Sequence, residues 1–298
     1  MNQYEPYWAD VTFCPPLTEE ILVFSKPPVR NFLIVTFTFS WGMWGVALLC
    51  PGSYLDLPGL PFFLLGSFGP MIGAAVMRRW RPARPEAGPA VRGSLRCTVS
   101  PLVLAVCLGA AGSVISSLAT WTTGSAGISL HAGRAGVYAY LGSPLLFFVA
   151  TLVMGPLSEE PGWRGYLQPH LREHMSPLRM SLAFGPLWAL WHLPLFFIDG
   201  TYQNSLGVLS TGGLTFLIST TALTVAVAFA YEQLGGLPAA ICVHFMSNLL
   251  PVVLGLASSA ALAWDAVGKI LLALVLLRSW HRIRQRQPMT AVAGAAAH

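Results

Sequence analysis

The sequence predicts an all-α, polytopic integral membrane protein with about eight transmembrane helices. Three observations carry this prediction: the scarcity of charge, the length of the apolar runs and the placement of the basic residues. Of the 298 residues, 54% are hydrophobic and only 10% are charged, and the mean hydropathy is +0.61. Soluble domains carry about 25% charged residues, so this chain has too few to cover a water-facing surface. Disorder is excluded as well, because 10 Trp and 16 Phe require burial.

Apolar runs of the length that crosses a bilayer recur along the chain. A helix needs about 20 apolar residues to cross the hydrocarbon core, and lipid leaves backbone groups no partners outside the segment. No internal repeat of the kind found in many transporters is visible. The predicted spans are 32–50, 60–78, 101–120, 136–157, 181–198, 212–231, 237–257 and 260–278.

The basic residues predict the orientation. Of the 17 Lys and Arg, only Arg134 and Lys269 lie outside four segments, which are the stretch before the first span, the 78–100 loop, the 158–180 segment and the tail after span eight. Eight spans place all four segments on one side, which the positive-inside rule makes cytoplasmic together with both termini. The net charge of +5 then reflects topology and contact with anionic lipid, and we expect no nucleic-acid partner.

The two ends and the cysteines give weaker signals. Residues 1–31 are expected to form a cytoplasmic N-terminal segment, because the first 16 lack the basic start and cleavage site of a signal peptide. Residues 279–298 are expected to form a basic cytoplasmic tail, and 32–278 the membrane domain. The five cysteines are scattered without CxxC spacing, which favours reduced apolar residues over a disulfide or zinc framework.

Ionisable residues that remain in or near the spans are functional candidates, because they are costly in lipid. Asp265 and Lys269 are four residues apart, and we interpret them as a mutually neutralising pair in preference to an ion-translocation site. His170 and His174 share this spacing but lack the acid that follows the first His of a zincin helix, which favours a solvated helix face. The full set is Glu159, Glu160, Arg164, His192, Glu232, His244, Asp265 and Lys269.

Two adjacent carboxylates close the fourth predicted span. Neighbouring helical residues point about 100° apart, so Glu159 and Glu160 are expected to face different surroundings. Arg164 is predicted to hold Glu160 in a bidentate pair, which leaves Glu159 free to act as a base. Pro161 is expected to end or kink the helix at Glu160. The alternative interpretation is a polar helix end at the membrane surface.

Two later segments favour a catalytic interpretation. His192 lies in an apolar, aromatic span, and His244 and Asn248 share one face of span seven at i,i+4 spacing. With Glu159 they predict a cavity that opens to the cytoplasm. A carboxylate and an imidazole can deprotonate water, and an imidazole N–H and an Asn amide can donate to an oxyanion. These are the parts needed for peptide hydrolysis by water. The sequence lacks the G-x-S-x-G and H-E-x-x-H motifs and a membrane Asp pair.

At these residues the chain resembles the CAAX protease and bacteriocin-processing family (CPBP, or Abi) of membrane endopeptidases, related to the prenyl-protein CAAX endopeptidase. The likeness covers about 145–255, within an expected protease core of about 136–257, and Trp188 stands where Phe is usual. The family pattern appears as Glu159-Glu160-Pro-Gly-Trp-Arg164, Trp188-Ala-Leu-Trp-His192 and His244-Phe-Met-Ser-Asn248.

The resemblance implies a role for each motif residue. Glu159 and His192 would activate water, His244 and Asn248 would bind the oxyanion, and Glu160 and Arg164 would support the site. Members are commonly labelled metalloproteases, and Glu159, His192 and His244 could supply three zinc ligands with an open fourth position. The same groups could polarise water without a metal, and we prefer this metal-free interpretation.

The expected function is therefore that of an intramembrane endopeptidase. Its expected partners are the lipid bilayer and a peptide substrate, either a prenylated C-terminal tail or a leader peptide. The rival predictions are an ion-coupled transporter, because acidic, basic and His side chains in spans also mark ion pathways, and a non-catalytic family member that acts as a scaffold or immunity protein. The sequence gives no oligomeric state.

Overall fold

The fold is a bundle of helices, as the sequence predicted. The computed structural model describes residues 22–80, 100–125, 128–139 and 142–285, and these residues form helices and no strand. This confirms the all-α class. The first 21 residues of the expected N-terminal segment, the arginines between 81 and 96, and the tail from 286 onward lie outside the described residues.

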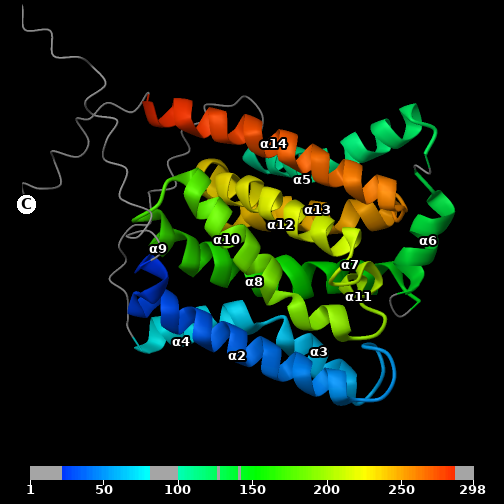
Figure 1. Cartoon of the computed structure of the whole chain (residues 1–298), viewed down its shortest axis with the longest axis horizontal. Coiled ribbons are helices and arrows are strands. Elements are labelled where there is room, and N and C mark those ends of the chain that lie inside the picture. The colour runs from blue at the N-terminus through cyan, green and yellow to red at the C-terminus, as the bar shows by residue number, and fades with distance from the viewer. Residues whose placement is uncertain (1–21, 81–99, 126–127, 140–141, 286–298) are drawn as a thin grey trace, which may run out of the picture.

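The N-terminal helices form one side of the bundle (Figure 1). A short 3-10 turn, η2 (Val23–Ser25), leads into α2 (Pro27–Leu49), which starts at two prolines because their missing N–H groups need no helical partner there. The bent pair α3 (Gly59–Gly66) and α4 (Gly69–Trp80), at 56°, packs along α2. Gly66 and Gly69 allow this approach, since a Cβ at Gly66 would lie 2.3 Å from the Trp44 indole nitrogen.

The middle of the chain is a continuous helical run that is interrupted by two π-helical turns. It consists of α7 (Pro144–Leu152), the π-helical η3 (Val153–Leu157), α8 (Ser158–Gly162), the π-helical η4 (Trp163–Leu167) and α9 (Gln168–Arg172). Pro161 was expected to end or kink the helix at Glu160, and the helix does not end there. Pro161 lies inside α8, and the helix continues because wider π turns on both sides accommodate the altered hydrogen-bond ladder.

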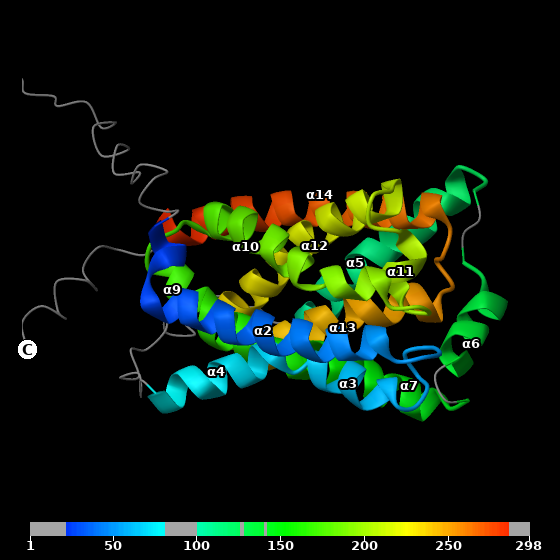
Figure 2. The same ribbon diagram turned by 60° about the horizontal axis from the view of Figure 1, so that its bottom comes forward.

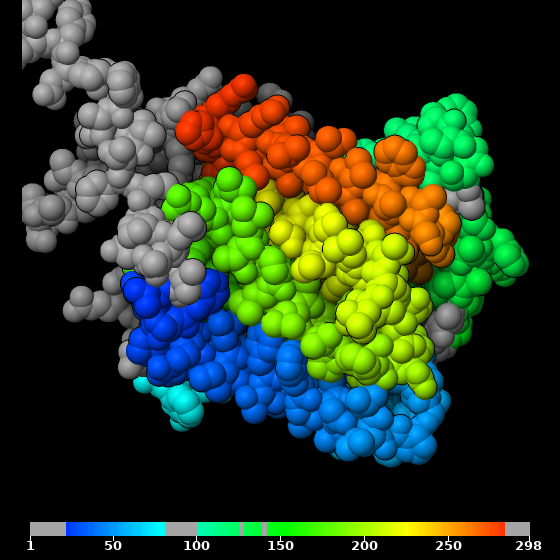
Figure 3. Space-filling model, viewed as in Figure 1, coloured from blue at the N-terminus to red at the C-terminus, as the bar shows by residue number. Residues whose placement is uncertain are grey.

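The remaining long helices pack around that run. α10 (Pro177–Trp191), which ends in the 3-10 turn η5 (Leu193–Phe197), packs on α12 (Thr211–Ala230). α12 packs on α14 (Ser259–Gln285), so that α2, α10, α12 and α14 lie side by side on one face (Figure 3). Behind them, α5 (Pro101–Thr122) packs on α13 (Leu237–Val253) and α14 (Figure 2).

Short elements connect the long helices. At one end of the bundle, α6 (Leu130–Ala139) contacts α7 and α13, and α11 (Tyr202–Leu206) contacts η5 and α12 (Figure 1). Between α12 and α13 the chain passes through the π-helical η6 (Tyr231–Gly235), where Gly235 and Gly236 have positive φ angles. Glycine takes these angles without steric cost, which allows the sharp reversal into α13.

The predicted count of eight spans is not confirmed. Within the described residues, five helices are long and apolar enough to cross a membrane, or six if the bent α3–α4 pair is one span. The predicted spans 136–157 and 237–257 do not meet this length. In the first, α7 has nine residues before the π turn, and in the second α13 has 17. Hydropathy averages over such breaks, so it overestimates the continuous helices.

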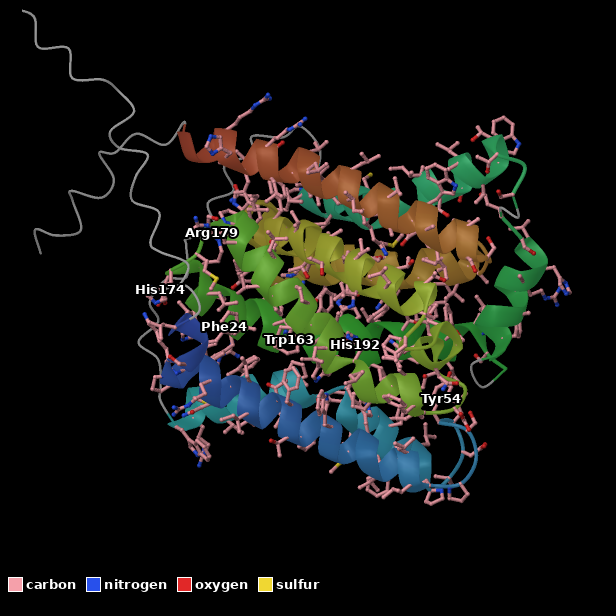
Figure 4. The ribbon with its side chains drawn as sticks, viewed as in Figure 1. Phe24, Tyr54, Trp163, His174, Arg179 and His192 are labelled. Carbon is pink, nitrogen blue, oxygen red and sulfur yellow. The ribbon has the colours of Figure 1, made fainter. Side chains whose placement is uncertain are left out.

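Most of the described basic residues gather at one end of the bundle, whereas Arg134 lies in α6 at the opposite end. The start of α2, the end of α4, the start of α10 and the end of α14 lie together there, and Figure 4 shows His174 and Arg179 at that end. Tyr54 marks the opposite end. The described part of the chain thus has a basic end and an opposite end that carries α6 and α11.

Candidate active site

The paired carboxylates lie in the interior because α8 packs closely on α4. A Cβ added at Gly162 would lie 2.2 Å from the backbone oxygen of Pro70, so only glycine allows the two helices to approach this far. Glu159 is 4% exposed and Glu160 is fully buried. The alternative interpretation of a polar helix end at the membrane surface is therefore contradicted for these two side chains.

Glu160 connects two motifs. Its Oε1 accepts a hydrogen bond from His244 Nδ1 at 2.7 Å and one from Arg164 Nη1 at 3.2 Å. The predicted pairing of Glu160 with Arg164 is present, but through a single oxygen, so the expected bidentate geometry was wrong. The guanidinium is turned by stacking instead. Its Cζ lies 4.4 Å from the ring centroid of Trp188 and 4.9 Å from that of Phe184.

Glu159 has a different partner. Its Oε2 accepts a hydrogen bond from the indole N–H of Trp188 at 2.7 Å, and the residue lines the main cavity, whereas Glu160 does not. The indole thus fixes one carboxylate oxygen and leaves Oε1 for a ligand in the cavity. Adjacent helix positions therefore face different surroundings, as the 100° rotation between them predicted.

His192 lies where α10 gives way to η5. Its Nδ1 is 2.8 Å from the carbonyl oxygen of Trp188, one turn earlier. Because a carbonyl only accepts, Nδ1 carries the proton, and the neutral ring presents the lone pair of Nε2. The ring packs edge-on against Phe216 of α12, with centroids 5.4 Å apart. The position therefore holds an oriented imidazole with one free acceptor nitrogen.

His244 and Asn248 share a face of α13, as their spacing predicted, and both line the cavity. The Asn248 amide is exposed and makes no hydrogen bond to another described residue. Gly155, in the π turn η3, provides space for it, since a Cβ there would lie 3.1 Å from Asn248 Nδ2.

The cavity has a volume of about 470 Å³, in the range of small-molecule and peptide pockets. His192 lies in the interior of the bundle, and the lining continues to Tyr54, at the end opposite the basic residues (Figure 4). The cavity thus combines four of the predicted site residues with a mostly apolar wall. Those four are Glu159, His192, His244 and Asn248.

The other candidates from the sequence divide between this cavity and the basic end. Asp265 and Lys269 form a 2.7 Å ion pair on the cavity wall. Glu232 is held by Arg172 at 2.8 Å and by Gln168 at 2.9 Å, away from the cavity. His170 and His174 lie near the basic end, where His170 Nδ1 is 2.7 Å from the Tyr166 carbonyl oxygen and His174 contacts Lys26.

A zinc site of three protein ligands does not fit the described residues. No three His, Cys, Asp or Glu side chains among them are grouped so as to hold a metal ion. The Nδ1 atom of His244 is hydrogen-bonded to Glu160, and that of His192 to the Trp188 carbonyl oxygen. Each ring therefore has only Nε2 without a partner among the described residues. The hydrolysis that we propose therefore uses protein side chains alone.

Two contributors to the site were not recognised from the sequence. Trp188 was noted as part of a motif, but its hydrogen bond to Glu159 was not foreseen. Gly155 was not singled out, although it lies against Asn248. The only local signal was an unusual density of Gly and Pro beside the carboxylates, in Gly155-Pro156 and Pro161-Gly162.

Comparison with known proteins relates the segment that carries these motifs to CAAX prenyl endopeptidases. Residues 141–250 match the family model described as type II CAAX prenyl endopeptidase Rce1-like, and this range contains all the motif residues. CAAX prenyl protease 2 of Methanococcus maripaludis is 29% identical over 136 residues, which are 45% of this chain and 49% of that protein. The chain thus spans about half the length of this curated relative. Over residues 141–250 the chain is therefore similar to Rce1-like CAAX prenyl endopeptidases, which agrees with the resemblance that its motifs carry.

Proposed function

We propose that the protein is an intramembrane endopeptidase that hydrolyses a peptide bond of the CAAX type with a water molecule activated in the cavity. The observation that carries this proposal is the convergence of Glu159, His192, His244 and Asn248 on one cavity from three separate parts of the chain. The similarity to a CAAX prenyl protease supports a prenylated C-terminal tail as the substrate.

We assign the activation of water to Glu159 and His192. Glu159 Oε1 and His192 Nε2 are the acceptors that remain after Trp188 has occupied Glu159 Oε2 and His192 Nδ1. A water that donates to either acceptor loses its proton as its oxygen attacks the peptide carbonyl carbon. The same proton then moves to the amide nitrogen when the C–N bond breaks, which gives an amine and a carboxylic acid, and the acid then releases its remaining proton to solvent.

We assign the stabilisation of the oxyanion to His244 and Asn248. The Asn248 amide donates from Nδ2. His244 already donates from Nδ1 to Glu160, so it can donate from Nε2 only as the imidazolium. Glu160 orients the ring through this hydrogen bond, and the imidazolium faces the negative charge that develops on the substrate oxygen. Glu160 thereby acts as a positioning residue.

Arg164 limits the charge at the buried centre. It pairs with Glu160, and it stacks on Trp188, whose indole N–H donates to Glu159. A buried carboxylate without a cation would be strongly destabilising. Arg164 therefore supports both carboxylates without lining the cavity.

The cavity wall suits an apolar peptide. Phe147, Leu223 and Leu256 contribute to a largely hydrophobic lining. The sequence predicted access from the cytoplasm. The lining reaches Tyr54, at the end opposite the basic residues (Figure 4), and also includes Tyr202, which supports access from that end or from within the membrane as well; the cytoplasmic opening stays a prediction. Labelling of a Tyr202→Cys variant from one side of sealed vesicles checks which side is exposed.

The core of the enzyme is proposed to lie within 136–257, with the basic end and both termini in the cytoplasm. The direct test is cleavage of a farnesylated C-a-a-X peptide by reconstituted protein. Glu159→Ala, His192→Ala and His244→Ala should each abolish product release, and wild-type turnover in all three would refute the mechanism. Loss of activity with a chelator that Zn²⁺ restores would overturn the metal-free chemistry.

A further inference from the structure

The same cavity holds a second charged cluster, which the hydrolytic mechanism does not use. Lys269 Nζ lies 2.7 Å from Asp265 Oδ2 and 3.2 Å from the hydroxyl oxygen of Ser219. All three residues line the cavity, and the side chains of Asp265 and Lys269 are only 10% and 11% exposed. They come from α14 and α12, and α14 lies outside the segment that matches the Rce1-like family model.

This pair retains hydrogen-bonding capacity. An ammonium group has three N–H donors, and Asp265 and Ser219 occupy two of them. The Oδ1 atom of Asp265 is buried and has no hydrogen-bond partner among the described residues. If the pair served only to neutralise two charges in the membrane, all hydrogen-bonding positions of both groups would be filled. The ammonium therefore retains one donor for a ligand, whereas the free oxygen of Asp265 lies against Gly112 of α5.

The surrounding helices fix the pair in place. A Cβ at Gly112 of α5 would lie 2.5 Å from Asp265 Oδ1 and 3.1 Å from Lys269 Cγ, so a larger residue would displace both side chains. Asp265 and Lys269 are one turn apart on α14, which lets the carboxylate orient the ammonium. The ammonium group of Lys269 is thus held in a fixed position in a mostly apolar cavity.

We infer that Lys269 binds the C-terminal α-carboxylate of the peptide being cleaved, with Asp265 as the residue that positions the ammonium. This inference rests on the proposed function. A C-a-a-X substrate ends three residues after its prenylated cysteine, so its carboxylate lies within about 10 Å of the bond next to that cysteine. A carboxylate that enters an apolar cavity needs a cation to offset its desolvation, and Lys269 lines the cavity that contains Glu159 and His192. The subsite would restrict cleavage to bonds near a chain end.

The experiment compares two farnesylated C-a-a-X peptides that differ only in a C-terminal acid or a C-terminal amide. The ratio of their kcat/KM values is measured with reconstituted wild-type protein and with three variants. Lys269→Arg keeps the cation. Asp265→Asn frees the cation from its internal carboxylate. The double variant Asp265→Asn/Lys269→Met removes both charges and so avoids a buried unpaired carboxylate, which Lys269→Met alone would leave.

We expect wild-type protein to prefer the acid by about tenfold or more, the range of a hydrogen bond to a charged group. Lys269→Arg should retain a preference and Asp265→Asn should increase it, while the double variant should cleave both peptides equally. A structural role alone would lower both rates and leave their ratio unchanged.

Equal cleavage of acid and amide by wild-type protein would overturn the inference and leave the proposed function intact. An acid preference that persists in the double variant would overturn it as well. If wild-type protein cleaves neither peptide, the proposed function fails and the subsite fails with it. Ion flux in sealed vesicles that depends on Lys269, with an unchanged acid-to-amide ratio, would assign the pair to transport instead.

Discussion

Glu159 and Glu160 are neighbours in sequence with identical side chains, yet their surroundings differ in every respect that matters for chemistry. Glu159 lines the cavity and accepts one hydrogen bond from an indole N–H, whereas Glu160 is fully enclosed and pairs with Arg164 and His244. One carboxylate keeps a free oxygen for a ligand, and the other orients the groups behind the site. The difference shows that a pair of acids acts through the two environments that a single helical step creates.

The largest expected effect is that of Glu159→Gln on turnover. The substitution preserves size and hydrogen-bonding reach but removes the base, and loss of a general base costs about 10²–10⁴-fold in rate. The measurement is kcat on a farnesylated C-a-a-X peptide together with thermal unfolding in detergent. Turnover should fall to background while unfolding stays close to wild type. A variant with substantial turnover would assign the base elsewhere.

Replacement of the enclosed acid should act on stability. Glu160→Ala leaves Arg164 buried without its carboxylate, and the loss of one partner of a buried ion pair costs about 3–5 kcal/mol. Denaturant unfolding of the purified protein measures this. Glu173→Ala is the matched control, because Glu173 is a surface acid, 53% exposed, beside His174. Equal stability of the two variants would contradict the assigned difference between the carboxylates.

The hydrogen bond from Trp188 can be removed without loss of the ring. Trp188→Phe keeps an aromatic face for Arg164 but removes the donor to Glu159, so we expect kcat to fall about 10- to 100-fold. Trp41→Phe provides the control, because its indole N–H donates to the Trp191 backbone at 3.0 Å. If both variants lower kcat equally, the effect belongs to packing.

The smallest expected effect concerns the space beside Asn248. A Cβ at Gly155 would lie 3.1 Å from Asn248 Nδ2 and would shift the amide by a few tenths of an ångström. We expect Gly155→Ala to lower kcat by about threefold to tenfold with little change in KM. Gly42→Ala should leave kcat unchanged, because the position has open space around it. A wild-type rate for Gly155→Ala would remove Asn248 from the oxyanion site.

The sequence predicted which residues gather at the cavity better than how they contact one another. The motif spacing selected Glu159, the two histidines and Asn248, which all line the cavity, and helical periodicity separated Glu159 from Glu160. The single-oxygen contact of Arg164 was not predictable, because stacking on Trp188 and Phe184 turns the guanidinium, and those rings come from another helix.

The same limit applies to the backbone. The helical run through Pro161 was missed because the local rule for the residue before proline takes no account of π turns on both sides. The count of eight spans was not confirmed within the described residues because hydropathy records composition rather than helix length, as α7 and α13 show. The cavity-lining position of Asp265 and Lys269 depends on how α14 packs against α5 and α12, which no local pattern contains.

The central claim is that Glu159 activates water and does not itself attack the peptide. A single turnover in H₂¹⁸O with enzyme in excess tests it directly, with mass spectrometry of the released product and of the enzyme fragment that contains Glu159. We expect one ¹⁸O atom in the new carboxylate of the product and none in the enzyme. Label in Glu159 would contradict the account, because it would mean that its carboxylate had formed a covalent intermediate.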